Sequence, residues 1–113
     1  MFPKTRRLTG KAVVFVIRRG RALSGPGIRI KWAPASRSVS RATIVTPLAF
    51  DKRATRRNRI KRQLREILGP LLTQFNPPVN LVVLVSGQAK GKSFAGLKAE
   101  LMALLRKGRL LSG

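Results

Sequence analysis

Residues 54–68, with the sequence ATRRNRIKRQLREIL, carry two overlapping patterns that constrain the fold more than any other stretch of the chain. Apolar side chains recur at the 3.6-residue period of a helix, at Ile60, Leu64, Ile67, Leu68 and Leu71. The other positions hold six cations and one acid, Glu66. We therefore predict an amphipathic helix whose apolar stripe packs on a core and whose opposite face is cationic.

The N-terminal tip of this predicted helix is also cationic, because Arg53, Arg56 and Arg57 lie beyond the end of the apolar stripe. A helix N-terminus already carries partial positive charge, so each cation there costs a few tenths to about 1 kcal/mol. Arginines three or four residues apart on a helix also repel one another. Cations beside free helix N–H groups are, however, a suitable site for phosphate. We therefore favour an anion-binding tip over a basic face that is merely solvated.

The charge of the whole chain points the same way. It has 25 Lys and Arg residues against 3 Asp and Glu residues, a net charge of +22, in 113 residues. A hydrophobic fraction of 43% is ordinary for a globular domain, and the length suits one domain. Such charge destabilises a compact monomer, and binding of a polyanion relieves the repulsion. We expect one folded domain that binds a polyanion.

The residue inventory excludes most protein-based chemistry. The chain has no Cys and no His, which removes thiol nucleophiles, imidazole bases and zinc-finger spacing. Three scattered carboxylates, those of Asp51, Glu66 and Glu100, are a poor basis for a two-metal nuclease site. The apolar run 12–17 is too short for a signal-peptide core or a membrane span. We expect a cytoplasmic protein without membrane contact, whose partner supplies any chemistry.

Before the basic helix, the sequence predicts a basic arm, an ambiguous segment and three strands. We expect residues 1–11 to form a flexible basic arm. Residues 12–19 fit either a helix, by spacing, or a strand, which their β-branched content slightly favours. Gly25-Pro26-Gly27 predicts a hairpin turn between residues 20–24 and a strictly alternating strand, 28–32. A third strand follows at 41–46.

After the basic helix, Gly69-Pro70 predicts a stop or kink, with one further turn over 71–75. The mostly apolar run 79–85 predicts a central strand covered on both faces. Residues 87–93 look like a phosphate loop, but three residues separate the two glycines where the motif needs four. We interpret them as a flexible basic loop. Ser93 is the expected cap of a last amphipathic helix.

Residues 57–62 read Arg-Asn-Arg-Ile-Lys-Arg and are followed by Arg65 and Glu66. This run resembles the signature of the bacterial ribonuclease P protein subunit, a family that shows R-N-R-x-K-R-x-x-R-E at the start of its central helix. Residues 18–21 (RRGR) resemble the end of the family's first helix, and the order of predicted elements fits as well. The resemblance therefore covers nearly the whole chain.

The resemblance implies an α+β fold of the order αβββαβα, in two layers, with a four-stranded mixed sheet. The βαβ crossover around the basic helix would be left-handed, against the usual rule. It also implies that residues 12–19 are helical, against the local preference. On this basis we predict that residues 1–113 form a single RNA-binding domain.

The function implied by the resemblance is that of the protein subunit of ribonuclease P. The protein would bind the catalytic RNA and the 5′ leader of precursor tRNA as a monomer in the holoenzyme. It would assist removal of the leader as the accessory subunit of an endoribonuclease, while the RNA holds the catalytic groups and the Mg²⁺ ions. A general structural RNA-binding protein, such as a small ribosomal protein, is the alternative that composition leaves open.

The residues expected to bind RNA lie on the basic helix or just before it: Lys52, Arg53, Arg56, Arg57, Asn58, Arg59, Lys61, Arg62 and Arg65. The expected leader-binding residues are Val13, Ile17, Arg29 and Lys31. Where the family usually has a lysine pair, this chain has Leu48 and Ala49, and we expect Lys52 and Arg53 to supply that charge. The family's cleft aromatics are also missing, so we expect the cleft to contact the RNA backbone rather than the bases.

Overall fold

The computed structural model describes residues 6–111. Its elements are α1 (Lys11–Arg19), β1 (Arg21–Ser24), β2 (Ile28–Pro34), β3 (Arg41–Val45), α2 (Ala54–Leu68), the 3₁₀ helix η2 (Gly69–Gln74), β4 (Val79–Val85), the 3₁₀ helix η3 (Gly87–Ala89) and α3 (Phe94–Lys107). The strands form one sheet in the order β1-β2-β4-β3. The sheet is mixed, because β3 and β4 are parallel and the other pairs are antiparallel. The predicted α+β class and element order are confirmed.

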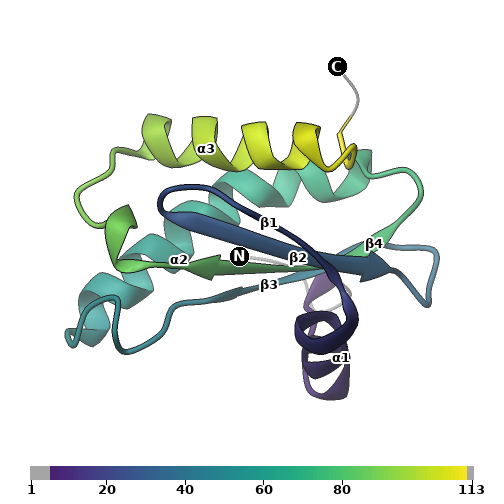
Figure 1. Ribbon diagram of the computed structural model, residues 1–113, viewed down its shortest axis with the longest axis horizontal. Helices are drawn as coiled ribbons and strands as arrows, with labels where there is room; N and C mark the ends of the chain where they lie inside the picture. The colour runs from purple at the N-terminus through teal and green to yellow at the C-terminus, as the bar shows by residue number, and fades with distance from the viewer. Residues whose placement is uncertain (1–5, 112–113) are drawn as a thin grey trace.

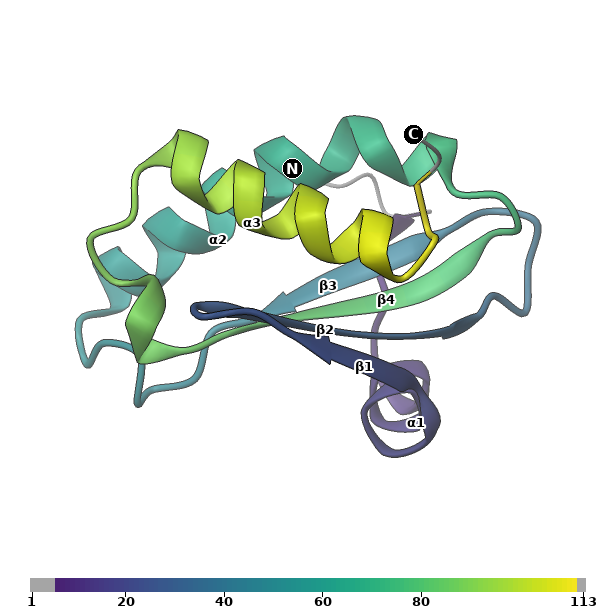
Figure 2. The same cartoon turned by 45° about the horizontal axis from the view of Figure 1, so that its top comes forward.

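Figures 1 and 2 show α2 and α3 on one face of the sheet and α1 on the other, near one end. The predicted two layers are therefore the sheet and the α2–α3 pair, and α1 adds cover to part of the second face. The crossover from β3 to β4 runs through α2 and η2.

Alternation along the strands separates two hydrophobic clusters. Ile28, Ile30 and Trp32 of β2 are buried toward α2 and α3, as the strict alternation predicted. Val82, in the middle of β4, is buried in the second cluster beneath α1. Because β4 carries buried side chains on both faces, the prediction of a doubly covered central strand is confirmed.

Residues 12–19 are helical, so the resemblance was right and the local preference for a strand was wrong. Val16 is fully buried, and Val13 and Ile17 pack beside it against the sheet. These three positions share one helical face, whereas Val14 and Phe15 are exposed. Packing of one apolar face on the sheet thus outweighs the β-branched composition of the segment.

The basic arm predicted for residues 1–11 lies partly outside the described residues. Within the described part, Arg7 forms a parallel bridge with Ala42, and the Leu8 amide donates to the Ala42 carbonyl at 3.0 Å. Leu8 is only 2% exposed. Residues 7 and 8 are therefore attached to the sheet beside β3 rather than free. The Leu8 side chain packs in the second hydrophobic cluster, beneath α1.

The stripe predicted for the basic helix is confirmed. Ile60, Leu64, Ile67 and Leu68 are buried in the main core, and Leu71 is partly buried against it. α2 ends at Leu68, directly before Gly69-Pro70, as predicted, and the 3₁₀ helix η2 that follows supplies the predicted further turn. This buried stripe fixes α2 on the sheet, so the cationic positions of the helix face outward.

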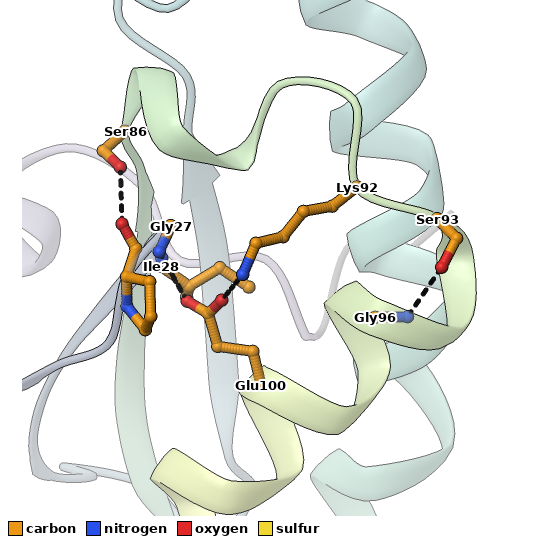
Figure 3. A network of polar contacts seen from close by, with 8 residues as sticks. Gly27, Ile28, Ser86, Lys92, Ser93, Gly96 and Glu100 are labelled. Atoms are coloured by element: carbon orange, nitrogen blue, oxygen red, sulfur yellow. Dashed lines mark hydrogen bonds and ion pairs between the residues drawn. The ribbon is translucent and has the colours of Figure 1, made fainter.

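Glu100 connects the hairpin, the basic loop and α3 (Figure 3). Its Oε2 accepts hydrogen bonds from the Gly27 amide at 2.8 Å and the Ile28 amide at 2.5 Å, and its Oε1 pairs with Lys92. Ser93 caps α3 as predicted, its Oγ accepting from the Gly96 amide at 3.0 Å. The loop that we predicted to be flexible is therefore held to the sheet through Lys92.

Candidate nucleic-acid interface

The structure gathers all nine predicted RNA-binding residues on α2 or within two residues before it. Six are exposed: Lys52, Arg53, Arg56, Asn58, Arg59 and Arg62. Three are half-buried: Arg57, Lys61 and Arg65. No acid lies in the first turn of the helix, and no side chain caps its N-terminus. The predicted clustering of cations at the tip is confirmed, while their contact with RNA stays a prediction.

The buried carboxylate of Asp51 contacts several groups at this tip. Its carboxylate is only 8% exposed, and its Oδ1 accepts a hydrogen bond from the Arg53 amide at 2.9 Å. Its Oδ2 lies 3.6 Å from Nη1 of Arg56 and 3.8 Å from Nζ of Lys90. One buried acid thus joins the start of α2 to the loop after β4.

The pKa of Asp51 is lowered from its ordinary value of 3.8. The hydrogen bond from the Arg53 amide is the main cause, and the charges of Lys90, Arg56 and Arg53 act in the same direction. Burial opposes them by raising the pKa. Asp51 is therefore ionised at neutral pH and attracts two cations that would otherwise repel each other.

Arg57 has a different role from the one its position in the sequence suggested. Its Nη1 donates to the backbone carbonyls of Asp51, at 2.8 Å, and Lys52, at 2.9 Å. The unfavourable effect of a cation at the helix tip, expected from the sequence, is therefore opposed at Arg57, because the chain turns back before α2 and presents two carbonyl groups to the guanidinium.

One flank of α2 borders a groove of about 360 Å³ against the loop after β4. Four cations line it, namely Arg56, Arg59, Lys90 and Lys92, together with one acid, Asp51. Sequence reasoning missed the two lysines as site residues. The basic composition of residues 87–93 was the available signal, but only the fold shows that this loop lies beside α2.

The other flank of α2 borders a smaller hollow of about 210 Å³ between the helix, β3 and the segment before α1. Arg65 lines it together with Arg7, Thr9 and Thr43. Cations therefore lie on both sides of the helix as well as at its tip.

The four predicted leader-binding residues lie on α1 and on the strand that it covers. Lys31 and Ile17 are in direct contact, since Nζ of Lys31 donates to the Ile17 carbonyl at 2.8 Å. Val13 and Ile17 are half-buried in the α1 cluster, and Arg29 is exposed. Three of the four thus hold α1 to the sheet, and Arg29 alone of them is fully exposed.

The sequence and the fold are similar to those of known proteins. The sequence model of the Ribonuclease P family matches residues 2–109. The chain is 39% identical over 95 residues to the ribonuclease P protein component of Thermus scotoductus, covering 84% of this chain and 55% of that protein. It is 36% identical over 107 residues to that of Xylella fastidiosa strain 9a5c, covering 94% and 78%.

Two solved structures share the fold. The RNase P protein of Staphylococcus aureus superposes with a TM-score of 0.86 at 17% identity, covering 96% of this chain and 100% of that one. The RNase P protein of Thermotoga maritima gives 0.79 at 23% identity, with coverage of 95% and 98%.

This chain belongs to the ribonuclease P protein family. It spans about half the length of the Thermus relatives that it matches. Within residues 6–111, none of the helices combines the length and apolar character that crossing a membrane requires.

Proposed function

We propose that this protein is the protein subunit of ribonuclease P and acts as a single copy in the holoenzyme. In this role it binds the catalytic RNA and the 5′ leader of precursor tRNA, and it assists magnesium-dependent removal of the leader. The observation that carries the proposal is the set of outward-facing cations on α2, fixed by a fully buried stripe and bordered by cationic hollows on both flanks.

The geometry of α2 suits an RNA backbone better than a small anion. A protein that neutralises several phosphates gains affinity by releasing condensed counterions, and this requires cations spread along a surface. Arg59 and Arg62 are exposed along the helix, and Lys90 and Lys92 extend the charge across the neighbouring loop. The surface therefore fits successive phosphates rather than one.

The leader would lie beside α1 and β2, on the face that carries Arg29. Because Lys31 is bonded to α1, Arg29 is the more available cation there. Contacts from the guanidinium of Arg29 and from the aliphatic side chains of α1 favour the RNA backbone over the bases. The exposed residues Lys52 and Arg53, which follow exposed Leu48 and Ala49, supply charge near the start of α2.

Hydrolysis itself belongs to the RNA and its Mg²⁺ ions. Two of the three carboxylates already serve the fold: Asp51 holds the start of α2, and Glu100 holds the hairpin turn. These tasks engage their oxygens with backbone amides and nearby cations, so neither is arranged to activate water.

The direct test is cleavage of precursor tRNA by the cognate catalytic RNA at low magnesium, with and without this protein. We expect the protein to raise the cleavage rate in the presence of the RNA and to cleave nothing alone. Cleavage by the nuclease-free protein without RNA would overturn RNA catalysis. No effect on the RNA-catalysed rate would favour a general structural RNA-binding protein instead.

A binding series tests the role of α2. If about six phosphates are neutralised, the slope of log K against log salt should be near −4 to −5. Arg59→Ala and Lys61→Ala should each flatten it by about one unit. Lys98→Ala, which removes an exposed cation from α3, is the matched control and should change the slope less. A parent slope near −1 would contradict extended phosphate contact.

A further inference from the structure

A second groove lies at the end of the sheet where α1 and α3 both terminate, away from the α2 surface. Figures 1 and 2 show α1 and the C-terminal end of α3 on opposite faces of this end. The groove has a volume of about 540 Å³ and is lined partly by Phe15, Trp32, Arg19, Arg21 and Arg109. A neighbouring hollow of about 470 Å³ shares Trp32, Arg21 and Arg109 with it.

Phe15 is the aromatic side chain that this groove presents to solvent. It is 57% exposed and lies on the opposite side of α1 from Val13, Val16 and Ile17, which face the sheet. Exposing a phenylalanine forfeits burial that is worth about 1.5–3 kcal/mol. The fold does not need Phe15 in this place, but a stacked nucleobase would use its face.

Three arginines surround the aromatic side chains without any acid to neutralise them. Within residues 6–111, the guanidinium groups of Arg19, Arg21 and Arg109 have no hydrogen-bond or ion-pair partner, and no carboxylate lines the groove. The C-terminal ends of α1 and α3 contribute about half a negative charge each. Three full positive charges exceed that total, so the groove favours an anion.

At Arg109 the backbone adopts a conformation that is unfavourable for a residue with a side chain. Residues 105–110 form the hydrogen-bond pattern that closes many helices, with the Leu110 amide donating to Leu105 at 2.9 Å and the Arg109 amide to Arg106 at 3.0 Å. The left-handed position of this pattern usually holds glycine, yet here Arg109 occupies it, with φ 60°. For a residue with a side chain this costs about 1–2 kcal/mol.

The glycine of this helix end stands one residue earlier. A Cβ added at Gly108 would lie 3.0 Å from Cη2 of Trp32, so glycine there allows the close approach of α3 to the tryptophan ring. Nothing comparable requires an arginine at 109. Strain of this kind is common at binding sites, and here it lies beside an exposed aromatic side chain and unpaired cations.

We propose that this groove binds single-stranded RNA, with one base stacked on Phe15 and the flanking phosphates on Arg19, Arg21 and Arg109. The inference extends the proposed function to a second surface, distinct from α2 and from the face of β2 that α1 covers. Aromatic stacking combined with backbone-tracking cations is how proteins hold unpaired nucleotides without reading their sequence. Double-stranded RNA would not expose a base to Phe15.

The test uses the whole chain and a short labelled single-stranded RNA. Phe15→Ala should weaken binding at least about fivefold, the lower limit for loss of one stacked base. The same substitution should have little effect on an abasic strand of equal length. Arg109→Gly should weaken binding and flatten the salt slope by about one unit, while the melting temperature stays the same or rises. Trp32 is the single tryptophan, so its emission should report occupancy directly.

Two matched controls distinguish the loss of groove contacts from a general loss of positive charge or of apolar surface. Val14→Ala removes another exposed apolar side chain of α1, and Arg106→Gln removes a cation from the same end of α3, yet neither residue lines the groove. Both should bind RNA like the parent. If Phe15→Ala and Arg109→Gly also bind like the parent, as they would if the groove held an acidic peptide, the proposal is overturned.

The outcome is also distinguishable from failure of the proposed function. If Arg59→Ala and Lys61→Ala weaken binding of the catalytic RNA, but the groove variants bind the short single strand like the parent, only the second site fails. If the groove variants weaken binding of the single strand and the α2 variants have no effect, the groove stands and the role of α2 fails.

Discussion

The guanidinium of Arg57 lies 2.8 Å from the carbonyl oxygen of Asp51, six residues earlier in the chain. The first arginine of the family signature therefore binds the protein's own backbone. This contact gives the signature a role in the fold, because the guanidinium joins the start of α2 to the loop before it.

Replacement of Arg57 should accordingly be costly to stability. Arg57→Ala removes two hydrogen bonds from a charged donor, and we expect the free energy of unfolding to fall by about 1 kcal/mol. Arg56→Ala is the matched control: its ion pair with Asp51 is 3.6 Å long and its own side chain is 58% exposed, so its loss should cost less than about 0.5 kcal/mol. Urea unfolding of both variants measures the difference, and equal stability of the two would show that the carbonyl contacts contribute nothing.

Asp51 predicts a dependence of stability on pH. Its pKa is lowered in the folded state, so its stabilising contribution is complete above the ordinary value of 3.8 and is lost as pH falls below it. Asp51→Asn should therefore be less stable than the parent at pH 7, and the difference should shrink toward pH 2.5. Denaturant melts across this range provide the measurement. A difference that stays constant with pH would mean that the charge of Asp51 is irrelevant.

The same variant makes a second, opposite prediction for RNA. Loss of the Asp51 charge releases Arg56 and Lys90 from an ion pair, so the affinity for RNA should rise even as stability falls. Binding at fixed salt distinguishes this result from simple unfolding, which would lower the affinity.

Lys31 should behave as a structural residue. Lys31→Met keeps the aliphatic stem but removes the hydrogen bond to Ile17, and we expect a loss of about 0.5–1.5 kcal/mol. Arg29→Met, on the same face of β2, has no such bond to lose and should unfold like the parent. For RNA the expectation is reversed, with Arg29→Met weakening leader binding more. If Lys31→Met leaves stability intact, the contact with α1 is not needed.

Gly20 and Gly69 differ in how much space surrounds the position that an added Cβ would take. A Cβ at Gly20 would lie 2.5 Å from the Val16 carbonyl oxygen and 2.8 Å from that of Trp32, so Gly20→Ala should destabilise the protein by about 1–3 kcal/mol. Gly69 has helical backbone angles and nothing within 4 Å of a Cβ, so Gly69→Ala should stabilise it by about 0.4–1 kcal/mol. Thermal melts that rank the two variants in the opposite order would refute this account of the α1–β2 junction.

Periodicity predicted the parts of the fold whose side chains alternate between core and solvent. The stripe through Leu64 placed α2, and the alternation through Ile30 placed β2. Residues 12–19 could not be assigned locally, because their apolar positions fit two periods and only packing on the sheet, in the cluster with Ala33 and Val82, selects the helix.

The candidate site was predictable only where it is continuous in the sequence. The cations of α2 lie within one helix, so the sequence places them together. Lys90 joins them only because β4 ends beside α2, and Phe15 and Arg109 line one groove only because α1 and α3 terminate at the same end of the sheet. Contacts to backbone carbonyls, such as those of Arg57, depend on the path of a loop and leave no pattern in residue types.

The position of β4 sets the order in which the protein can be assembled. Among the strands of residues 6–111, β4 is the last to be synthesised, yet it lies between β2 and β3, which do not pair with each other. While the ribosome is still translating residues before 79, the nascent chain can form the β1–β2 hairpin, but β3 can pair only with the short segment at Arg7 and Leu8. The sheet is completed when β4 inserts between the edges of β2 and β3. This step is non-local and therefore slow, and until it occurs the apolar edges are open to other chains. Throughout that interval the dense positive charge repels other nascent copies, so the same cations that suit RNA also protect the unfinished sheet from aggregation.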